Sequence, residues 1–423
     1  MKQKERRIDR RDFLRTVSAA GLGSILASAE AIAAGPNEPD TSEKTDQKQY
    51  PQVPKRRLGK LTWIADSGNK VPLEVPCLAL GMMFDAVEQQ IVLRKAIQFG
   101  VTYWDTAYSY SGGNSELGIG KFLSRDPHVR KELFIVSKAS QATTVEDVEK
   151  RLQESMKRMQ TDYIDLYYGV HQLKSPGQLT DDLKKWAQNA KNRKLIRFFG
   201  VSTHENMAQC LTAAARLDWI DAIMVKYNFR EMQDPQMHDA IDACYKAGIG
   251  LTAMKTQARG QALETEADKK LTDHFIERGF TAGQAKLKVV LDDKRISSVA
   301  VGRGNLSELS LNVAVALDKT KLASDDMKVF KQVAQETCTG YCAGCANICG
   351  SALPEMPYVG DVMRCLMYYN SYGETETAKE LFATIPHKVR NKLLTADYSL
   401  AEARCPQRMP IARLMAEAAE KLA

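Results

Sequence analysis

The 423-residue sequence contains no run of about 18 consecutive apolar residues, the length that a membrane-spanning helix requires. It also has no basic stripe interleaved with aromatic side chains, so its mild formal charge of +7 gives little support to nucleic-acid binding. With 26 Gly and 14 Pro, it lacks the bias of collagen-like or low-complexity chains. We therefore expect a folded protein with no nucleic-acid partner and no membrane span in the mature chain.

Residues 1–34 have the composition of a targeting segment. Residues 10–15 read R-R-D-F-L-R, an apolar run follows at 17–29, and the small-residue patterns at 27–29 and 31–33 resemble cleavage sites. This order resembles the bacterial twin-arginine export signal. It predicts that the twin-arginine export machinery carries the chain to the periplasm or another extracytoplasmic compartment. The alternatives are a disordered basic tail and an amphipathic surface helix.

A regular alternation follows a polar, proline-rich linker at 35–54 and occupies residues 55–325. Short apolar or β-branched runs predict strands at 75–80, 102–106, 133–138, 164–171, 196–202, 222–228, 250–255 and 296–301. Amphipathic stretches such as Glu146–Met159 lie between them, and Thr144 and Ser202-Thr203 stand where helix N-caps are expected.

The predicted fold class is α/β, specifically a (β/α)8 TIM barrel. Strand and helix patterns alternate over roughly the length of one closed parallel barrel. A doubly wound open sheet is the competitor, but no G-x-G-x-x-G follows the first predicted strand, which weighs against a dinucleotide-binding sheet.

Polar residues at the predicted strand ends are the first candidates for chemistry, because barrel active sites lie at the carboxyl ends of the strands. These residues are Asp105, Lys138 and His171, and Tyr110 follows Asp105 closely. A cation beside a tyrosine stabilises the tyrosinate and lowers its pKa, and a histidine can hydrogen-bond a substrate oxygen. The alternative is a structural ion pair between Asp105 and Lys138 with a surface tyrosine at 110.

These residues give the chain a resemblance to the aldo-keto reductase family. The pattern D-T-A-x-x-Y with G-x-S-E behind it is matched by Asp105, Tyr110 and residues 115–116, and V-S-K ends at Lys138. The resemblance implies interconversion of a carbonyl and an alcohol, on sugar-like or small aldehydes and ketones, by hydride transfer with NADP or NAD. Tyr110 is then the general acid, Lys138 its pKa tuner, Asp105 the partner of Lys138, and His171 the residue that orients the carbonyl.

Two positions depart from the family pattern. His171 lies six residues after Asp165 where the family usually has five, and one extra residue turns a strand side chain to the opposite face. A bulge at Gly169 would restore the direction; otherwise His171 is a structural histidine outside the barrel. The family's Asn after G-x-S is here Thr203, followed by His204, which either takes part of an amide-binding role or caps a helix.

The resemblance also implies a dinucleotide-binding side. The implied contacts are Ser202, Tyr227, Lys255, Arg303 and Asn312. Tyr227 would stack on the nicotinamide, the alternative being barrel packing. Gly302 and Glu308 stand where many relatives place a Lys and an Arg for the 2′-phosphate, so the choice between NADP and NAD stays open.

The last hundred residues, 326–423, predict a small α-helical domain with a cysteine cluster. Cysteines at 338, 342, 345 and 349 form a C-x3-C-x2-C-x3-C array close to a bacterial ferredoxin pattern, and Cys405-Pro406 resembles its C-P step. The pattern predicts one [4Fe–4S] cluster held by Cys338, Cys342 and Cys345 with either Cys349 or Cys405, and hence an electron-transfer partner. Structural zinc and disulfides are the alternatives.

A different class of function also fits the sequence. The barrel would then no longer catalyse a reaction. It would hold a cofactor or another ligand, and zinc or disulfides would stabilise the tail. Some exported aldo-keto reductases resemble this chain in carrying a C-terminal domain of this kind.

Overall fold

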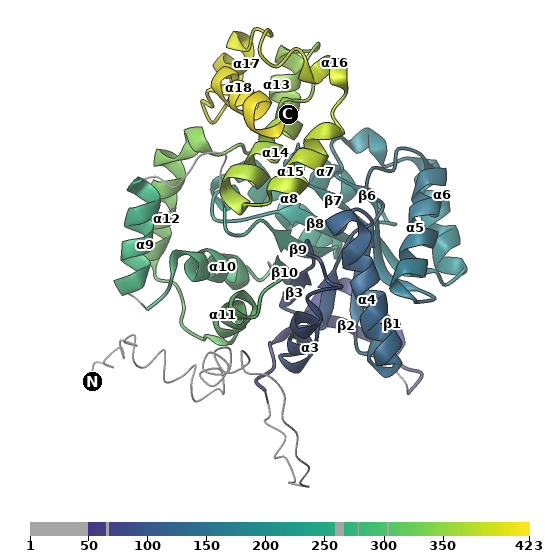
Figure 1. The fold of residues 1–423 in the computed structure, drawn as a ribbon. Helices are drawn as coiled ribbons and strands as arrows, with labels where there is room; N and C mark the ends of the chain where they lie inside the picture. The colour runs from purple at the N-terminus through teal and green to yellow at the C-terminus, as the bar shows by residue number, and fades with distance from the viewer. Residues whose placement is uncertain (1–49, 65–66, 259–265, 278, 303) are drawn as a thin grey trace, which may run out of the picture.

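The computed structural model describes residues 50–423 except 65–66, 259–265, 278 and 303. The predicted export signal and most of the linker therefore lie outside the described residues. Eight strands close into a barrel in the order β10-β3-β4-β5-β6-β7-β8-β9, and every neighbouring pair is parallel. The predicted (β/α)8 barrel is thus confirmed (Figure 1).

The barrel strands fall within or close to the predicted runs. They are β3 (Leu78–Gly81), β4 (Tyr103–Asp105), β5 (Phe134–Lys138), β6 (Ile164–His171), β7 (Ile196–Thr203), β8 (Ala222–Lys226), β9 (Gly250–Met254) and β10 (Ser298–Val301). Alternate residues of these strands face the interior, where Tyr103, Leu166 and Met224 share one apolar cluster.

Helices surround the strands. They are α3 (Gln90–Gln98), α4 (Asn114–Arg125), α5 (Val145–Met159), α6 (Asp181–Asn192), α7 (Met207–Ala214), α8 (Pro235–Ala247), α9 (Glu266–Glu277), α10 (Ala282–Asp292) and α11 (Leu306–Leu317). The predicted cap at Thr144 is confirmed, because Thr144 and Asp147 form a capping box at the start of α5. The predicted start at Ser202-Thr203 is wrong: both residues belong to β7, and Asn206 precedes the first turn of α7.

A two-stranded hairpin that the sequence pattern did not predict plugs the barrel at the amino ends of its strands. It consists of β1 (Lys55–Ile64) and β2 (Lys70–Pro76), paired antiparallel. Leu58, Leu61 and Leu73 join the interior cluster of the barrel. The hairpin closes this end, so the open mouth of the barrel lies at the carboxyl ends of the strands.

The C-terminal part has its own core above the mouth of the barrel (Figure 1). Its helices are α13 (Ala346–Ala352), α14 (Val359–Met367), the π-helix η7 (Tyr368–Tyr372), α15 (Thr375–Ala383), α16 (His387–Arg390), α17 (Ser399–Arg404) and α18 (Ile411–Leu422). In contrast, α12 (Ser324–Glu336) packs on the barrel, since the Phe330 ring centre lies 4.9 Å from that of Phe229. The helical unit with a separate core therefore begins after α12, beyond the boundary at 325 that we expected.

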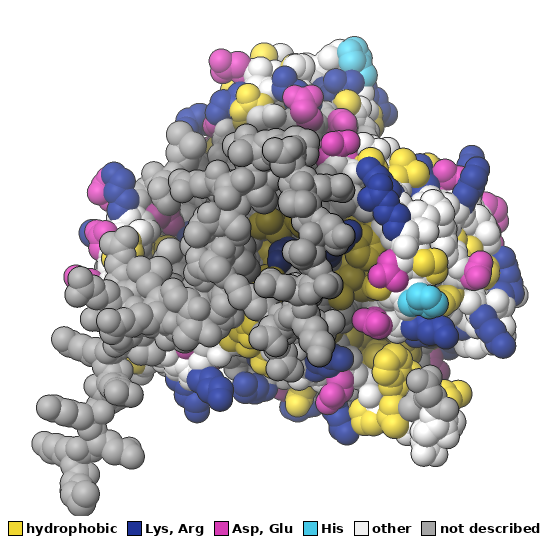
Figure 2. Space-filling model, turned by 60° about the horizontal axis from the view of Figure 1, so that its bottom comes forward, with side chains coloured by type: hydrophobic (Ala, Val, Ile, Leu, Met, Phe, Trp, Pro, Cys, Tyr) yellow, Lys and Arg dark blue, Asp and Glu magenta, His cyan; other side chains and the backbone are white. Residues whose placement is uncertain are grey.

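The charge distribution on the surface and the lengths of the helices agree with what the composition predicts. On the face shown in Figure 2, Lys and Arg are interspersed with Asp and Glu among the described residues. No helix in the described part of the chain combines the length and the apolar character needed to cross a membrane.

Candidate active site

Asp105 and Lys138 form a buried ion pair at the ends of β4 and β5. The Lys138 Nζ atom lies 2.8 Å from Asp105 Oδ1 and donates a hydrogen bond of 2.7 Å to the carbonyl oxygen of Thr106. Burial raises the pKa of Asp105 and lowers that of Lys138, and their mutual attraction opposes both shifts. The pair therefore fixes the Lys138 ammonium group at the barrel mouth, with its charge balanced by Asp105.

Tyr110 lies beside this pair in a short 3-10 turn, η2 (Tyr110–Gly113). The Lys138 Nζ atom is 4.6 Å from the centre of its ring. Burial raises the pKa of Tyr110 well above its usual value, and the charge of Asp105 raises it further. The lowered tyrosine pKa that we predicted from the sequence is therefore wrong: burial and the charge of Asp105 both raise it, and Tyr110 keeps its proton at neutral pH.

His171 faces the same site because β6 contains the bulge predicted at Gly169. The pairing of β6 with β7 skips Gly169: Tyr168 pairs with Gly200 and Val170 with Val201. Only glycine fits here, since a Cβ at Gly169 would lie 2.4 Å from the Phe199 ring. This bulge is confirmed, and it restores the direction of the histidine side chain.

The His171 ring is neutral and held in place. Its Nδ1 atom is 2.9 Å from Ser140 Oγ, and its ring centre is 6.2 Å from that of Tyr110. Burial lowers the pKa of His171 well below its usual value, and the charges of Lys138 and Arg364 lower it further. A neutral imidazole beside Tyr110 can donate or accept a hydrogen bond without changing the net charge of the site.

His204 is a second histidine at the mouth, and it does not cap a helix. It follows β7, three residues before α7 begins, and its buried Nδ1 atom has no hydrogen-bond partner among the described residues. Burial lowers the pKa of His204 well below its usual value. The helix-cap interpretation is therefore wrong, and His204 instead lines the cavities at the mouth.

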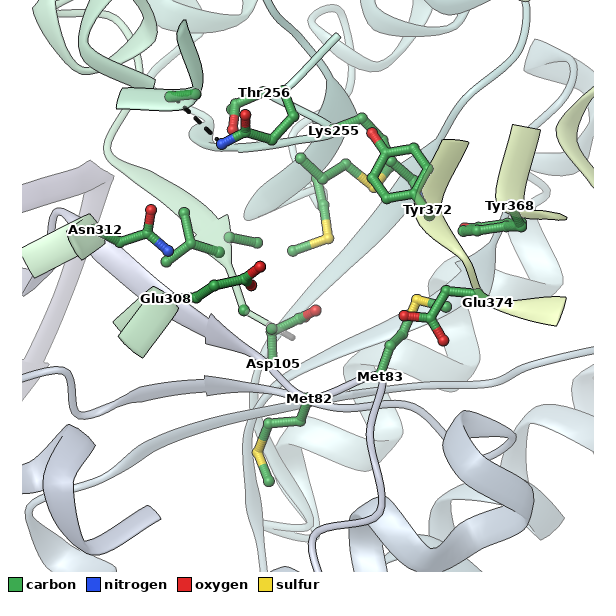
Figure 3. Close-up of a pocket in the computed structure, with 18 of the residues that line it drawn as sticks. Met82, Met83, Asp105, Lys255, Thr256, Glu308, Asn312, Tyr368, Tyr372 and Glu374 are labelled. Carbon is green, nitrogen blue, oxygen red and sulfur yellow. Dashed lines mark hydrogen bonds between the residues drawn. The ribbon is translucent and has the colours of Figure 1, made fainter. Parts of the chain in front are cut away.

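Two adjoining cavities open at the mouth. The first is lined by the ends of β3, β9 and β10 and by α11, and it includes Asp105 (Figure 3). The second is lined by Ser140 and His171 on the barrel side and by α14 and α15 on the other side. The residues that line both cavities are Met83, Tyr110, His204 and Tyr368.

Four of the five predicted cofactor residues separate into three groups. Lys255 and Asn312 line the first cavity. Ser202 lines neither of the two cavities, and its hydroxyl accepts a hydrogen bond of 3.3 Å from the backbone N–H of Gln172. Arg303 lies outside the described residues.

The predicted role of Tyr227, stacking on the nicotinamide, is wrong. It follows β8, where Met224 faces the interior and the alternate residues face the helices, so its buried ring packs in the layer between strands and helices. Its hydroxyl donates a hydrogen bond of 2.8 Å to Asp293 Oδ2 at the end of α10. The alternative of barrel packing is the one the structure supports.

Residues of the C-terminal part complete the second cavity. The sequence motifs did not predict this contribution. Arg364 on α14 contacts Glu205 Oε1 at 3.1 Å and Asp361 Oδ1 at 3.0 Å, and Lys174 contacts Asp361 Oδ2 at 2.6 Å. Burial raises the pKa of Glu205, and Arg364 opposes this shift. This network fastens the tail to the barrel loops. Its members lie far apart in the sequence, so no local signal marks them.

Four of the five cysteines predicted as metal ligands lie together, and the fifth lies apart from them. Cys342, Cys345, Cys349 and Cys405 line one largely apolar cavity between α13, α14 and α18. Cys338 does not line it, because Tyr341 lies between Cys338 and Cys342 and is anchored in the barrel by a 2.6 Å hydrogen bond from its hydroxyl to Glu231. The predicted ligand set is therefore corrected by removing Cys338. Cys349 and Cys405, the two predicted alternatives for the fourth ligand, both line the cavity.

The thiols of this cavity are partly buried, and no disulfide bond joins them. Burial raises the pKa of Cys345 to about 11 and that of Cys349 to about 12, and all nine cysteines of the chain are free. In the described residues, no three His, Cys, Asp or Glu side chains are arranged to hold a metal ion. The cysteine loop also contacts the barrel, since Lys226 Nζ donates a hydrogen bond of 3.0 Å to the carbonyl oxygen of Cys342.

A closed barrel with a tyrosine, a buried Lys–Asp pair and a neutral histidine at its mouth defines a (β/α)8 enzyme equipped for proton transfer. Comparison with known sequences identifies the class: residues 78–335 match the model of the aldo/keto reductase family. The chain belongs to the aldo/keto reductase family, and it is an NAD(P)-dependent oxidoreductase.

Relatives with recorded functions are similar over most of the barrel. An L-galactose dehydrogenase of Arabidopsis thaliana is 24% identical over 270 residues, which cover 58% of this chain and 84% of the relative. An L-glyceraldehyde 3-phosphate reductase of Escherichia coli O157:H7 is 23% identical over 315 residues, covering 62% of this chain and 90% of the relative.

Solved structures agree on the fold. An aldo-keto reductase from Bacillus halodurans in its holo form covers 67% of this chain and 96% of its own, with a TM-score of 0.54 and 20% identity. A thermostable aldo-keto reductase in complex with the inhibitor epalrestat covers 64% of this chain and 99% of its own, with a TM-score of 0.50 and 26% identity.

Proposed function

We propose that the barrel interconverts a carbonyl and an alcohol on a sugar-like or small aldehyde or ketone, with Tyr110 as the proton donor. One observation carries the proposal: Tyr110 and His171 line the same cavity, beside the buried Lys138. A tyrosine that keeps its proton at neutral pH is suited to protonate the oxygen of a carbonyl that is being reduced.

The neighbouring residues have distinct proposed roles. Lys138, fixed by Asp105, stabilises the tyrosinate that remains after Tyr110 has given up its proton. His171 orients the substrate by a hydrogen bond from its Nε2 atom to the carbonyl oxygen, while Ser140 holds the Nδ1 atom on the opposite side of the ring. When the reaction runs toward the carbonyl, the same tyrosinate accepts the proton of the alcohol.

The walls of the first cavity fit a nicotinamide dinucleotide. Asn312 and Glu308 project into it from α11 (Figure 3), and they offer amide and carboxylate groups to ribose hydroxyls. Gly302 lets the chain after β10 approach the end of β3 closely on this wall, since a Cβ there would lie 2.6 Å from the carbonyl oxygen of Gly81. A bound reduced nicotinamide supplies a hydride to the carbonyl carbon. Lys255 contributes to the same wall.

Substitution of Tyr110 by Phe tests the catalytic role. We expect carbonyl reduction with NADPH or NADH to fall by about 10²- to 10⁴-fold in kcat, because general acid catalysis contributes about this factor. Tyr108→Phe is the matched control, since the Tyr108 ring stacks on Arg151 and Arg158 rather than lining either cavity at the mouth. Activity that survives unchanged in Tyr110→Phe would refute the assignment and favour a barrel that only holds ligands.

The cavities also favour polyhydroxylated substrates. The names of the two relatives above specify L-galactose and L-glyceraldehyde 3-phosphate, which are hydroxylated carbonyl compounds. Several side chains that line the second cavity carry hydroxyl or amide groups: Ser109, Ser111, Ser140, Gln141, Gln172, Thr377 and Thr384. Such groups can bind several substrate hydroxyls at once.

We further propose that Cys342, Cys345, Cys349 and Cys405 hold one [4Fe–4S] cluster. Four thiols around one cavity, three of them spaced C-x2-C-x3-C and the fourth followed by Pro406, support it. Four thiolates are the ligand set of such clusters, and they also suit zinc, which remains the alternative. The cluster would exchange electrons with a partner protein.

Metal and labile-sulfide analysis of protein purified without oxygen tests this cluster. About four iron and four sulfide per chain are expected for one [4Fe–4S] cluster. Zinc, or no metal, would contradict it and leave the tail as a structural appendage.

Export by the twin-arginine route remains a proposal, supported by the R-R-D-F-L-R pattern at residues 10–15. We expect the full-length chain in the periplasm or another extracytoplasmic compartment. Cell fractionation after replacement of Arg10 and Arg11 by Lys tests this: the protein should stay in the cytoplasm. An unchanged distribution would contradict the export signal.

A further inference from the structure

We propose that the C-terminal part supplies a specificity-determining residue to the active site: Tyr368, held against Lys255, binds a hydroxyl group on the carbon next to the reacting carbonyl. The proposal rests on the proposed function, because it assigns a substrate feature to the same site. It deepens that function by naming the substrate class as α-hydroxy aldehydes and ketones.

Tyr368 reaches the reacting groups from outside the barrel. It is the first residue of η7, its side chain is buried, and it lines both cavities together with Tyr110. It lies close enough to Tyr110 and Lys138 to interact electrostatically with both. Figure 3 shows it on the wall of the first cavity opposite Glu308 and Asn312.

Lys255 fixes the position of Tyr368. Its Nζ atom lies 3.8 Å from the centre of the Tyr368 ring and 4.7 Å from that of Tyr372. Two aromatic faces at this distance hold an ammonium group by cation–π attraction. Burial lowers the pKa of Lys255, and its interaction with Tyr368 opposes that shift. A lysine from the barrel thus orders a tyrosine from the tail.

The arrangement gives the mouth two tyrosine–lysine pairs. Tyr110 with Lys138 comes from η2 and the end of β5, whereas Tyr368 with Lys255 comes from η7 and the segment directly after β9. Two tyrosines that line one cavity suit a substrate with two oxygen atoms on adjacent carbons, one that is reduced and one that is only bound. A site built to hydrogen-bond a hydroxyl discriminates against an analogue that lacks it.

Hydroxyacetone and butanone form a suitable pair of probes, because they differ only by a hydroxyl in place of a methyl group. We expect the wild-type protein to prefer hydroxyacetone in kcat/KM. Tyr368→Phe, which retains the ring over Lys255, should lower kcat/KM for hydroxyacetone by about 10- to 100-fold and change butanone by less than about 3-fold. Tyr369→Phe is the control, since Tyr369 lines neither cavity and faces Lys421.

Lys255→Met tests the positioning role of the lysine. Lys255→Met should reproduce part of the loss in kcat/KM for hydroxyacetone. Combined with Tyr368→Phe it should cause little further loss, because both changes weaken the same interaction, between Tyr368 and the substrate hydroxyl. Equal losses for the two ketones, or no loss for either, would overturn the proposal. Additive losses would overturn the role of Lys255.

Equilibrium binding separates this proposal from the proposed function. Propane-1,2-diol and butan-2-ol are the corresponding alcohols, and calorimetry can measure their binding to the Tyr110→Phe protein loaded with NADP. We expect the diol to bind at least about 10-fold more tightly, and Tyr368→Phe in the same protein to remove the difference. Turnover that survives in Tyr110→Phe refutes the proposed function, whereas equal binding of the two alcohols refutes the role of Tyr368.

Discussion

The buried pair of Asp105 and Lys138 predicts a large and pH-dependent loss of stability in Lys138→Met. The two side chains are 5% and 1% exposed, so removal of the ammonium group leaves the carboxylate buried without its ion-pair partner. Breaking a buried pair in this way costs about 3–5 kcal/mol in the free energy of unfolding. We therefore expect one of the most destabilised single variants at the barrel mouth.

The pH dependence has a definite sign. Burial already raises the pKa of Asp105 in the folded protein, and the loss of Lys138 raises it further. A carboxyl group whose folded-state pKa is raised stabilises the fold below its unfolded pKa of about 3.9, and this stabilisation is lost as the pH rises through the folded pKa. The unfolding temperature of Lys138→Met should therefore fall, relative to the wild type, as the pH rises from about 4 toward alkaline values.

Thermal unfolding across this pH range, followed by circular dichroism, measures the effect. The matched control is Asp105→Asn with Lys138→Met, which removes both charges and should regain most of the lost stability and all of the pH dependence. If Lys138→Met unfolds at the wild-type temperature at pH 8, or if the double variant is no more stable than the single one, the reasoning about the buried pair is refuted.

Three further predictions follow from individual residues. Gly169→Ala should cost about 1–3 kcal/mol in the free energy of unfolding, measured by urea titration, and should lower kcat, because its Cβ would lie 2.4 Å from the Phe199 ring; wild-type stability would contradict the bulge. Glu308→Lys should improve KM for NADP more than KM for NAD, since a cation replaces an anion on the cavity wall; equal changes would place Glu308 away from the 2′-phosphate. Cys405→Ser should lose most of the bound iron while Cys338→Ser retains it, measured by metal analysis; the reverse would contradict the revised ligand set.

Periodicity and glycine signals in the sequence were sufficient to predict the barrel and the meeting of Asp105, Lys138 and Tyr110. The apolar runs gave the strands, and a parallel barrel brings all their carboxyl ends to one mouth. Gly169 predicted the bulge that turns His171 into the site, because a glycine within a strand marks a bulge or a close approach.

The rest depended on tertiary contacts that have no local signal. Tyr227 follows an apolar strand buried on both faces, so its pattern could not tell the interior from the helix layer. Cys338 fitted the cysteine spacing, but the anchoring of Tyr341 by Glu231, a residue of the barrel, separates it from the other four. The position of Tyr368 over the mouth depends on how the tail packs, which sequence spacing does not encode.

Transfer of deuterium is the most direct test of the central claim that this site reduces a carbonyl with NAD(P)H and Tyr110. Wild-type protein would be mixed with hydroxyacetone and reduced nicotinamide cofactor deuterated at C4, and the product examined by NMR. We expect deuterium at the carbinol carbon of propane-1,2-diol with the wild type, and almost none over the same time with Tyr110→Phe. No deuterium with the wild type, or equal labelling with both proteins, would contradict the account.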